Sequence, residues 1–64
     1  MKVNGVEVEL KETQALNKYL NDNNYKIDRV VVEINGEIIS KEFYSTRFLK
    51  RDDVIEIVHF VGGG

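Results

Sequence analysis

The residues Lys2-Val3-Asn4-Gly5-Val6-Glu7-Val8-Glu9-Leu10 place an Asn-Gly pair between two short apolar runs. Both central residues of a type I′ turn need a positive φ angle, which Asn and Gly tolerate better than most residues. The stretch therefore predicts a β-hairpin. In its second arm Val6, Val8 and Leu10 alternate with two glutamates, so this strand is expected to be half buried.

A short helix is predicted after the hairpin. Thr13 is a reasonable N-cap for it. Leu16, Tyr19 and Leu20 follow at spacings of three and four, which places them on one helical face. The helix is expected to span roughly ten residues and to end at Asn23-Asn24, because asparagine enters the left-handed conformation that closes a helix.

The second half of the chain is rich in β-branched residues. Residues 29–34 run into a second Asn-Gly pair at 35–36, followed by Glu37-Ile38-Ile39, and this pattern predicts another tight turn between two strands. Residues 54–61 form a further β-prone run after the polar turn 50–53. This final strand is expected to lead directly into the end of the chain.

The order hairpin, helix and further strands predicts an α+β domain, with one mixed sheet of four to five strands and one main helix across one face. This order matches a β-grasp, or ubiquitin-like, fold. Phe43, Phe48 and Leu49 are expected to fill the core from an irregular segment or a short 3₁₀ turn. Strand alternation and the helical stripe give the predicted core: Val3, Val8, Leu16, Leu20, Val32, Ile34, Phe48, Leu49, Ile55 and Ile57.

Length and composition limit the class of protein. Sixty-four residues are enough for one domain, expected at residues 1–61 with a flexible tail at 62–64. The absence of cysteine excludes disulfides and thiolate metal sites. A net charge of -2 gives no electrostatic attraction to nucleic acid. No run approaches the ~18 apolar residues of a membrane span, so we expect a cytoplasmic protein without a membrane or nucleic-acid partner.

Three glycines, Gly62, Gly63 and Gly64, end the sequence. Because glycine lacks a Cβ atom, such a tail can thread a passage that any side chain would block. Fully extended, it reaches about 10 Å beyond the last strand. This length can carry the Gly64 carboxylate into the active site of another protein, with Gly62 and Gly63 providing clearance.

An apolar docking surface is predicted beside this tail. If the isoleucines within residues 54–57 face the core, alternation turns Val58 and Phe60 outward. Val58, Phe60 and Val61 are therefore the candidate partner-binding residues. The alternative is a β-bulge near His59 that turns one of these side chains back inward.

No constellation of catalytic side chains is visible. The chain has one histidine, no cysteine, no phosphate-binding loop motif and no cluster with metal-ligand spacing. Asp52 and Asp53 are interpreted as a solvated turn. His59 is interpreted as a surface residue, although it could contact a partner or a phosphate. We therefore expect a protein that is not an enzyme, whose only reactive group is the Gly64 carboxylate.

In combination these features resemble the ThiS family, the ubiquitin-like sulfur carriers of thiamin thiazole biosynthesis. The likeness is carried by Val3-Asn4-Gly5, the helix residues 16–20, the stretch 32–39 and the ending 55–64. It implies that a ThiF-like enzyme uses ATP to adenylate Gly64. Sulfur supplied indirectly by a cysteine desulfurase then gives a thiocarboxylate, which a ThiG-like thiazole synthase receives. The chain itself would bind no cofactor and no metal, and it would be monomeric when free.

Three other interpretations remain open. The first is a molybdopterin-type sulfur carrier, which the length and the absence of proline disfavour. The second is a ubiquitin-like protein modifier, whose terminal glycine would form an amide with a lysine. The third is a β-grasp binding module, such as a small RNA-binding domain, but its basic face is not indicated because the nine lysines and arginines are scattered among eleven acidic residues.

Overall fold

Both Asn-Gly pairs form the tight turns that the sequence predicts. The structure is a computed structural model that describes residues 1–60. Asn4 and Gly5 have φ angles of 51° and 82°, and Asn35 and Gly36 have φ angles of 53° and 85°. These are the positive angles that a type I′ turn requires, and each turn joins two antiparallel strands.

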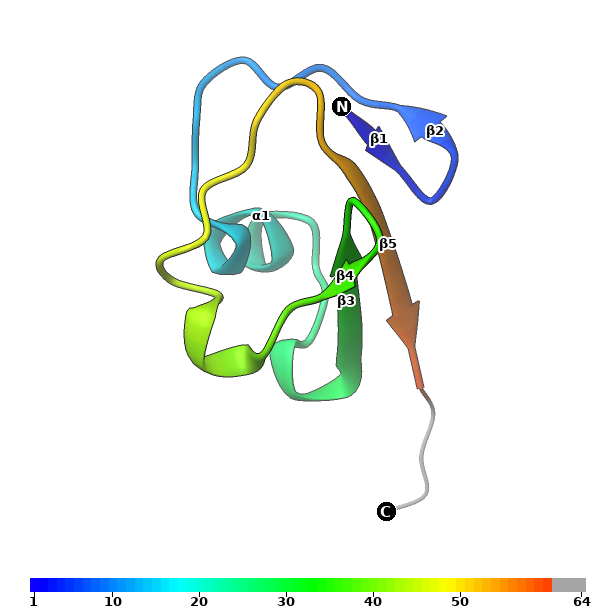
Figure 1. Cartoon of the computed structure of the whole chain (residues 1–64). Coiled ribbons are helices and arrows are strands. Elements are labelled where there is room, and N and C mark those ends of the chain that lie inside the picture. Colours follow the sequence, from blue (N-terminus) through cyan, green and yellow to red (C-terminus); the bar gives the residue numbers. More distant parts are fainter. Residues whose placement is uncertain (61–64) are drawn as a thin grey trace.

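One mixed sheet is formed by β1 (Lys2–Val3), β2 (Val6–Glu7), β3 (Val30–Ile34), β4 (Glu37–Ile38) and β5 (Val54–His59). The strand order is β2-β1-β5-β3-β4 (Figure 1). β5 therefore lies in the middle, parallel to β1 and antiparallel to β3. The predicted mixed sheet is confirmed, with five strands.

The helical segments are α1 (Leu16–Asp22) and two short 3₁₀ turns, η1 (Ile27–Arg29) and η2 (Lys41–Phe43). α1 lies across one face of the sheet, so the chain has the two layers of a β-grasp fold (Figure 1). The helix has seven residues and is shorter than predicted. Its end agrees with the prediction, because Asn24 has a φ angle of 65°.

The prediction that Thr13 caps α1 is wrong, since the N-cap is Ala15. Residues 13–16 are held by the segment that precedes β5. The Thr13 hydroxyl donates to the Leu49 carbonyl at 3.1 Å, and the Leu16 N–H donates to the Arg47 carbonyl at 2.9 Å. In a helix capped by Thr13, the Thr13 hydroxyl would accept from the Leu16 N–H. Here both groups bond to distant carbonyls instead, so the helix begins later.

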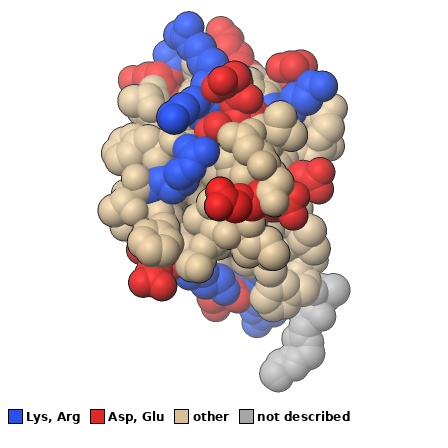
Figure 2. Space-filling model, viewed as in Figure 1, with Lys and Arg blue, Asp and Glu red and all other residues tan. Residues whose placement is uncertain are grey.

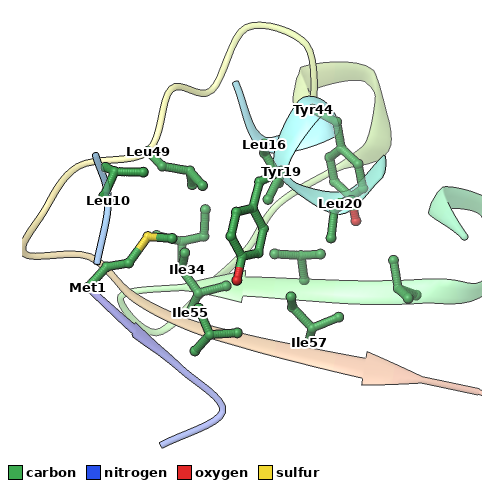
Figure 3. Close-up of a cluster of buried hydrophobic side chains, with 13 residues drawn as sticks. Met1, Leu10, Leu16, Tyr19, Leu20, Ile34, Tyr44, Leu49, Ile55 and Ile57 are labelled. Atoms are coloured by element: carbon green, nitrogen blue, oxygen red, sulfur yellow. The ribbon is translucent and has the colours of Figure 1, made fainter. Parts of the chain in front are cut away.

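The core lies between α1 and the inner face of the sheet. In Figure 3, Leu16, Tyr19 and Leu20 point from α1 toward the strands that carry Ile34 and Ile55. The buried hydrophobic residues are Met1, Val3, Leu10, Leu16, Tyr19, Leu20, Val30, Val32, Ile34, Tyr44, Leu49, Ile55 and Ile57. Eight of the ten predicted core residues are in this set; the exceptions are Val8, which is half-buried, and Phe48.

Phe43 and Phe48 do not fill the core as predicted, because both side chains are about half exposed, at 54% and 51%. Phe48 forms a β-bridge with Ala15, and neighbouring residues in extended backbone point in opposite directions. Leu49 consequently takes the buried position and is fully covered. The edge residue Val6 also stays exposed, since β2 is the outermost strand next to β1.

Candidate functional site

The strand that precedes the terminal glycines is bonded on both of its edges. β5 pairs with β3 over five residue pairs, from Val30 opposite His59 to Ile34 opposite Ile55. On its other edge β1 pairs with the first two residues of β5. The side chain of Asn4 then bonds both backbone groups of Ile57. Hydrogen bonds on both edges therefore hold β5 in place up to the residues that precede the glycines.

Val58 and Phe60 point away from the core, as predicted. Ile55 and Ile57 are buried, whereas Val58 is 60% and Phe60 is 45% exposed. The Phe60 N–H donates to the Arg29 carbonyl at 3.0 Å, so the pairing with the β3 side continues past the last residue of β5. The alternative of a bulge near His59 is therefore excluded.

The exposed face of the sheet is wider than the sequence analysis indicates. Val31 lies directly opposite Val58, and Val54 lies earlier on β5 on the same face. Ile38 joins them because it pairs with Glu33, the residue two positions after Val31. We call the exposed residues Val31, Ile38, Val54, Val58 and Phe60 the outer apolar face. Alternation along 30–34 could have indicated Val31, but only the register places Ile38 here.

The remaining predicted site residues are Val61, Gly62, Gly63 and Gly64. They lie outside the residues that the structure describes. Their roles in partner binding, clearance and sulfur attachment therefore stay predictions. His59 is exposed and its role also stays a prediction.

Asp52 and Asp53 do not form a pair of catalytic acids. The prediction that both are solvated is wrong for Asp53, which is only 2% exposed, whereas Asp52 is exposed. Asp53 accepts hydrogen bonds from the Lys50 N–H at 2.8 Å and the Asn35 amide at 2.9 Å, and it forms an ion pair with Arg47 at 3.3 Å. Through these contacts the Asp53 carboxylate connects the turn before β5 with the turn between β3 and β4.

Burial by itself would raise the pKa of Asp53. The hydrogen bonds from Lys50, Arg47 and Asn35, together with the Arg47 charge, outweigh burial and hold the pKa of this carboxyl below its ordinary value. Asp53 is therefore an ionised structural acceptor. Taking up a proton would remove the charge that these hydrogen bonds and the ion pair stabilise, so Asp53 is not suited to act as a catalytic base.

Metal and membrane sites find no support in the described part of the chain. Within residues 1–60, no group of three or more His, Cys, Asp or Glu residues is arranged to hold a metal ion. The same residues contain no helix that is long and apolar enough to cross a membrane.

On the face shown in Figure 2, acidic and basic side chains are interspersed and form no continuous basic patch.

A helix-covered mixed sheet, whose central strand presents apolar side chains and is followed in the sequence by terminal glycines, defines a β-grasp protein. The model of the ThiS family matches residues 1–64. The chain belongs to the ThiS family. This confirms the family predicted from sequence. As a member of this family, the chain is a small carrier protein and not a catalyst.

Individual relatives agree with this assignment. The sulfur carrier protein ThiS of Bacillus subtilis is 45% identical over 65 residues, which cover 100% of this chain and 98% of that protein. The crystal structure of the thiamine biosynthesis protein ThiS from Geobacter metallireducens superposes with a TM-score of 0.83. It is 29% identical, over 98% of this chain and 96% of that one.

A further similarity concerns a much larger protein. A thiazole synthase of Magnetococcus marinus is 46% identical to this chain over 37 residues. These residues are 58% of this chain but only 11% of that protein. The match thus relates this chain to one part of the synthase.

Proposed function

We propose that this chain carries sulfur on its C-terminal glycine for the formation of the thiazole of thiamin. The observation that carries the proposal is full-length identity of 45% to a sulfur carrier protein, combined with a terminal Gly62-Gly63-Gly64. A carrier needs no catalytic side chains of its own. It needs a folded surface that partners recognise and a terminus that reaches their active sites.

The proposed chemistry starts with the Gly64 carboxylate, which is a poor electrophile. A ThiF-like enzyme joins a carboxylate oxygen to the α-phosphate of ATP, and pyrophosphate leaves. A persulfide, formed from cysteine by a desulfurase, then attacks the acyl carbon and displaces AMP. Cleavage of the resulting sulfur–sulfur bond by a thiol leaves a thiocarboxylate on Gly64 and a disulfide on the donor. ATP is bound by the partner in this scheme.

Two partners follow from this scheme. The similarity to part of a thiazole synthase supports a ThiG-like enzyme as the acceptor of sulfur. We assign the docking of both partners to the outer apolar face, whose residues Val58 and Phe60 are nearest in the sequence to the tail; Val61 stays a predicted partner contact. Exposed apolar surface of this kind is typical of interaction sites, and β5 connects it directly to the terminus.

The proposal is tested by the intact mass of the protein after incubation with ATP, cysteine and an extract of its own cells. We expect a gain equal to the replacement of one oxygen by sulfur, located at Gly64 by fragmentation. A variant without Gly63 and Gly64 is the control; it should keep its fold and show no gain. The extract must first load the Bacillus subtilis relative.

Two results would contradict the proposal. One is no mass gain in an extract that loads the relative. The other is a stable amide between the terminal glycine and lysines of other proteins, which would show a protein modifier instead.

A further inference from the structure

Two glutamates lie directly opposite each other on the outer apolar face. Glu33 on β3 pairs with Glu56 on β5 in the antiparallel register. Directly opposed residues have Cβ atoms about 5 Å apart, and like charges in such positions destabilise a sheet. None of the ion pairs and side-chain hydrogen bonds within residues 1–60 includes either glutamate. The fold therefore maintains a repulsive pair that forms no ion pair within the described residues; the nearest cation in the register is Lys2, which lies opposite Val54 on the same face.

Apolar side chains flank this acid pair at both ends and on the β4 side, whereas its β1 side carries Lys2 and Asn4. Ile38 lies beside Glu33 in the register, and the pair formed by Val31 and Val58 lies two residues along both strands. Val54 lies two residues before Glu56 on β5, and all four side chains are exposed. The arrangement is an apolar rim on three sides of two negative charges. A partner that covered the rim with apolar groups alone would bury both charges unpaired, which is strongly unfavourable.

We propose that the activating enzyme inserts one arginine or lysine side chain between Glu33 and Glu56 when it docks on the outer apolar face. This inference rests on the proposed function, because it assumes that the chain is adenylated. A guanidinium or ammonium group has enough donors to bond both carboxylates. Such a contact fixes the register of docking and speeds the encounter through electrostatic attraction. The repulsion between the glutamates is then relieved only in the complex.

The test compares two double variants that change the net charge equally. In Glu33→Gln with Glu56→Gln, the acid pair loses its charge while the side-chain size is kept. In the control, Glu37→Gln with Glu42→Gln, two exposed acids change on β4 and η2; Glu37 pairs with Ile34, whose side chain faces the core. The ThiF-like enzyme of the same cells is assayed by ATP–pyrophosphate exchange, with KM and kcat for each carrier at low and high salt.

We expect the first variant to raise KM roughly tenfold with kcat unchanged, which is the signature of lost docking. Its KM should also depend less on salt than that of the wild type. The control should stay within about twofold of the wild type. Removing the repulsion should also raise the thermal unfolding midpoint of the first variant. This variant should therefore be more stable than the wild type but dock more weakly.

An unchanged KM for the first variant, with wild-type salt dependence, overturns the inference and leaves the proposed function intact. An equal increase in KM for both variants also overturns it, because net charge would then explain the effect. If the enzyme adenylates the Bacillus subtilis relative but not the wild-type chain, the proposed function fails, and this inference fails with it.

Discussion

The side-chain amide of Asn4 pairs with both backbone groups of Ile57. Its Oδ1 accepts from the Ile57 N–H at 2.8 Å, and its Nδ2 donates to the Ile57 carbonyl at 3.3 Å. β1 ends at Val3 and pairs only with the first two residues of β5. The Asn4 amide continues this pairing to the next part of β5. Asn4 therefore has two functions, since it also takes the positive φ angle of the hairpin turn.

Two substitutions of Asn4 separate these functions. Asn4→Gly keeps the turn conformation but removes both hydrogen bonds, and we expect the free energy of unfolding to fall by about 1–2 kcal/mol. Asn4→Ala removes the same hydrogen bonds and leaves a Cβ atom in the left-handed region without the polar side chain that lets asparagine adopt it, which costs about 1 kcal/mol more than Asn4→Gly. Urea unfolding measures both values. Wild-type stability of Asn4→Gly would show that the amide contributes nothing to holding β5.

The buried Asp53 carboxylate predicts a pH-dependent stability. Its pKa is lowered by folding, so in acid the unfolded chain binds a proton at this residue before the folded chain does. The stabilising effect is complete above the unfolded pKa of about 3.9. It is lost as the pH falls through the lower folded pKa.

Asp53→Asn tests this origin of the pH dependence. We expect the substitution to lower the free energy of unfolding at pH 7 by about 2 kcal/mol, because an ionised acceptor is lost. It should also flatten the fall in stability below about pH 4. Asp52→Asn, on the exposed neighbour, is the control and should change neither. Urea unfolding at pH 7, 4 and 3 measures these effects, and an unchanged acid profile for Asp53→Asn would refute this assignment.

Two large apolar side chains predicted to lie in the core differ strongly in burial. Leu20 is fully buried in α1, whereas Phe48 is 51% exposed. Leu20→Ala should lower the free energy of unfolding by about 3 kcal/mol through the cavity it leaves. Phe48→Ala should lower it by less than about 1 kcal/mol, because much of its area is already in water. A larger loss for Phe48→Ala would show that its ring packs in the folded protein in solution.

Local sequence patterns were sufficient where the determining interactions are local. The two Asn-Gly turns and the alternation of Ile55, Ile57 and Val58 depend on backbone angles and strand periodicity, and the structure agrees with both. Thr13, Phe48 and Asp53 were misplaced because each is positioned by a residue far away in the sequence. For Asp53 the distant partner is Asn35, 18 residues earlier, which adds to the nearby Lys50 and Arg47.

The candidate site shows the same division. Val58 and Phe60 could be assigned from alternation along one strand. The width of the outer apolar face could not, because it depends on which residues of β3, β4 and β5 lie opposite one another. The pairing of Glu33 with Glu56 is a property of register alone. Single-sequence reasoning does not determine register across 23 residues of chain.

The outer apolar face itself is tested by Val58→Ser and Phe60→Ala. Both side chains are largely exposed, so we expect each variant to keep its fold and to lose less than about 1 kcal/mol of stability. Each should raise the KM for adenylation roughly tenfold, since truncation of a buried interface anchor costs more than about 1 kcal/mol. Phe43→Ala is the matched control, because Phe43 is equally exposed but lies on η2. If Phe43→Ala alone weakens adenylation, the activating enzyme recognises the η2 side, and the strand leading to Gly64 serves only to support the terminus.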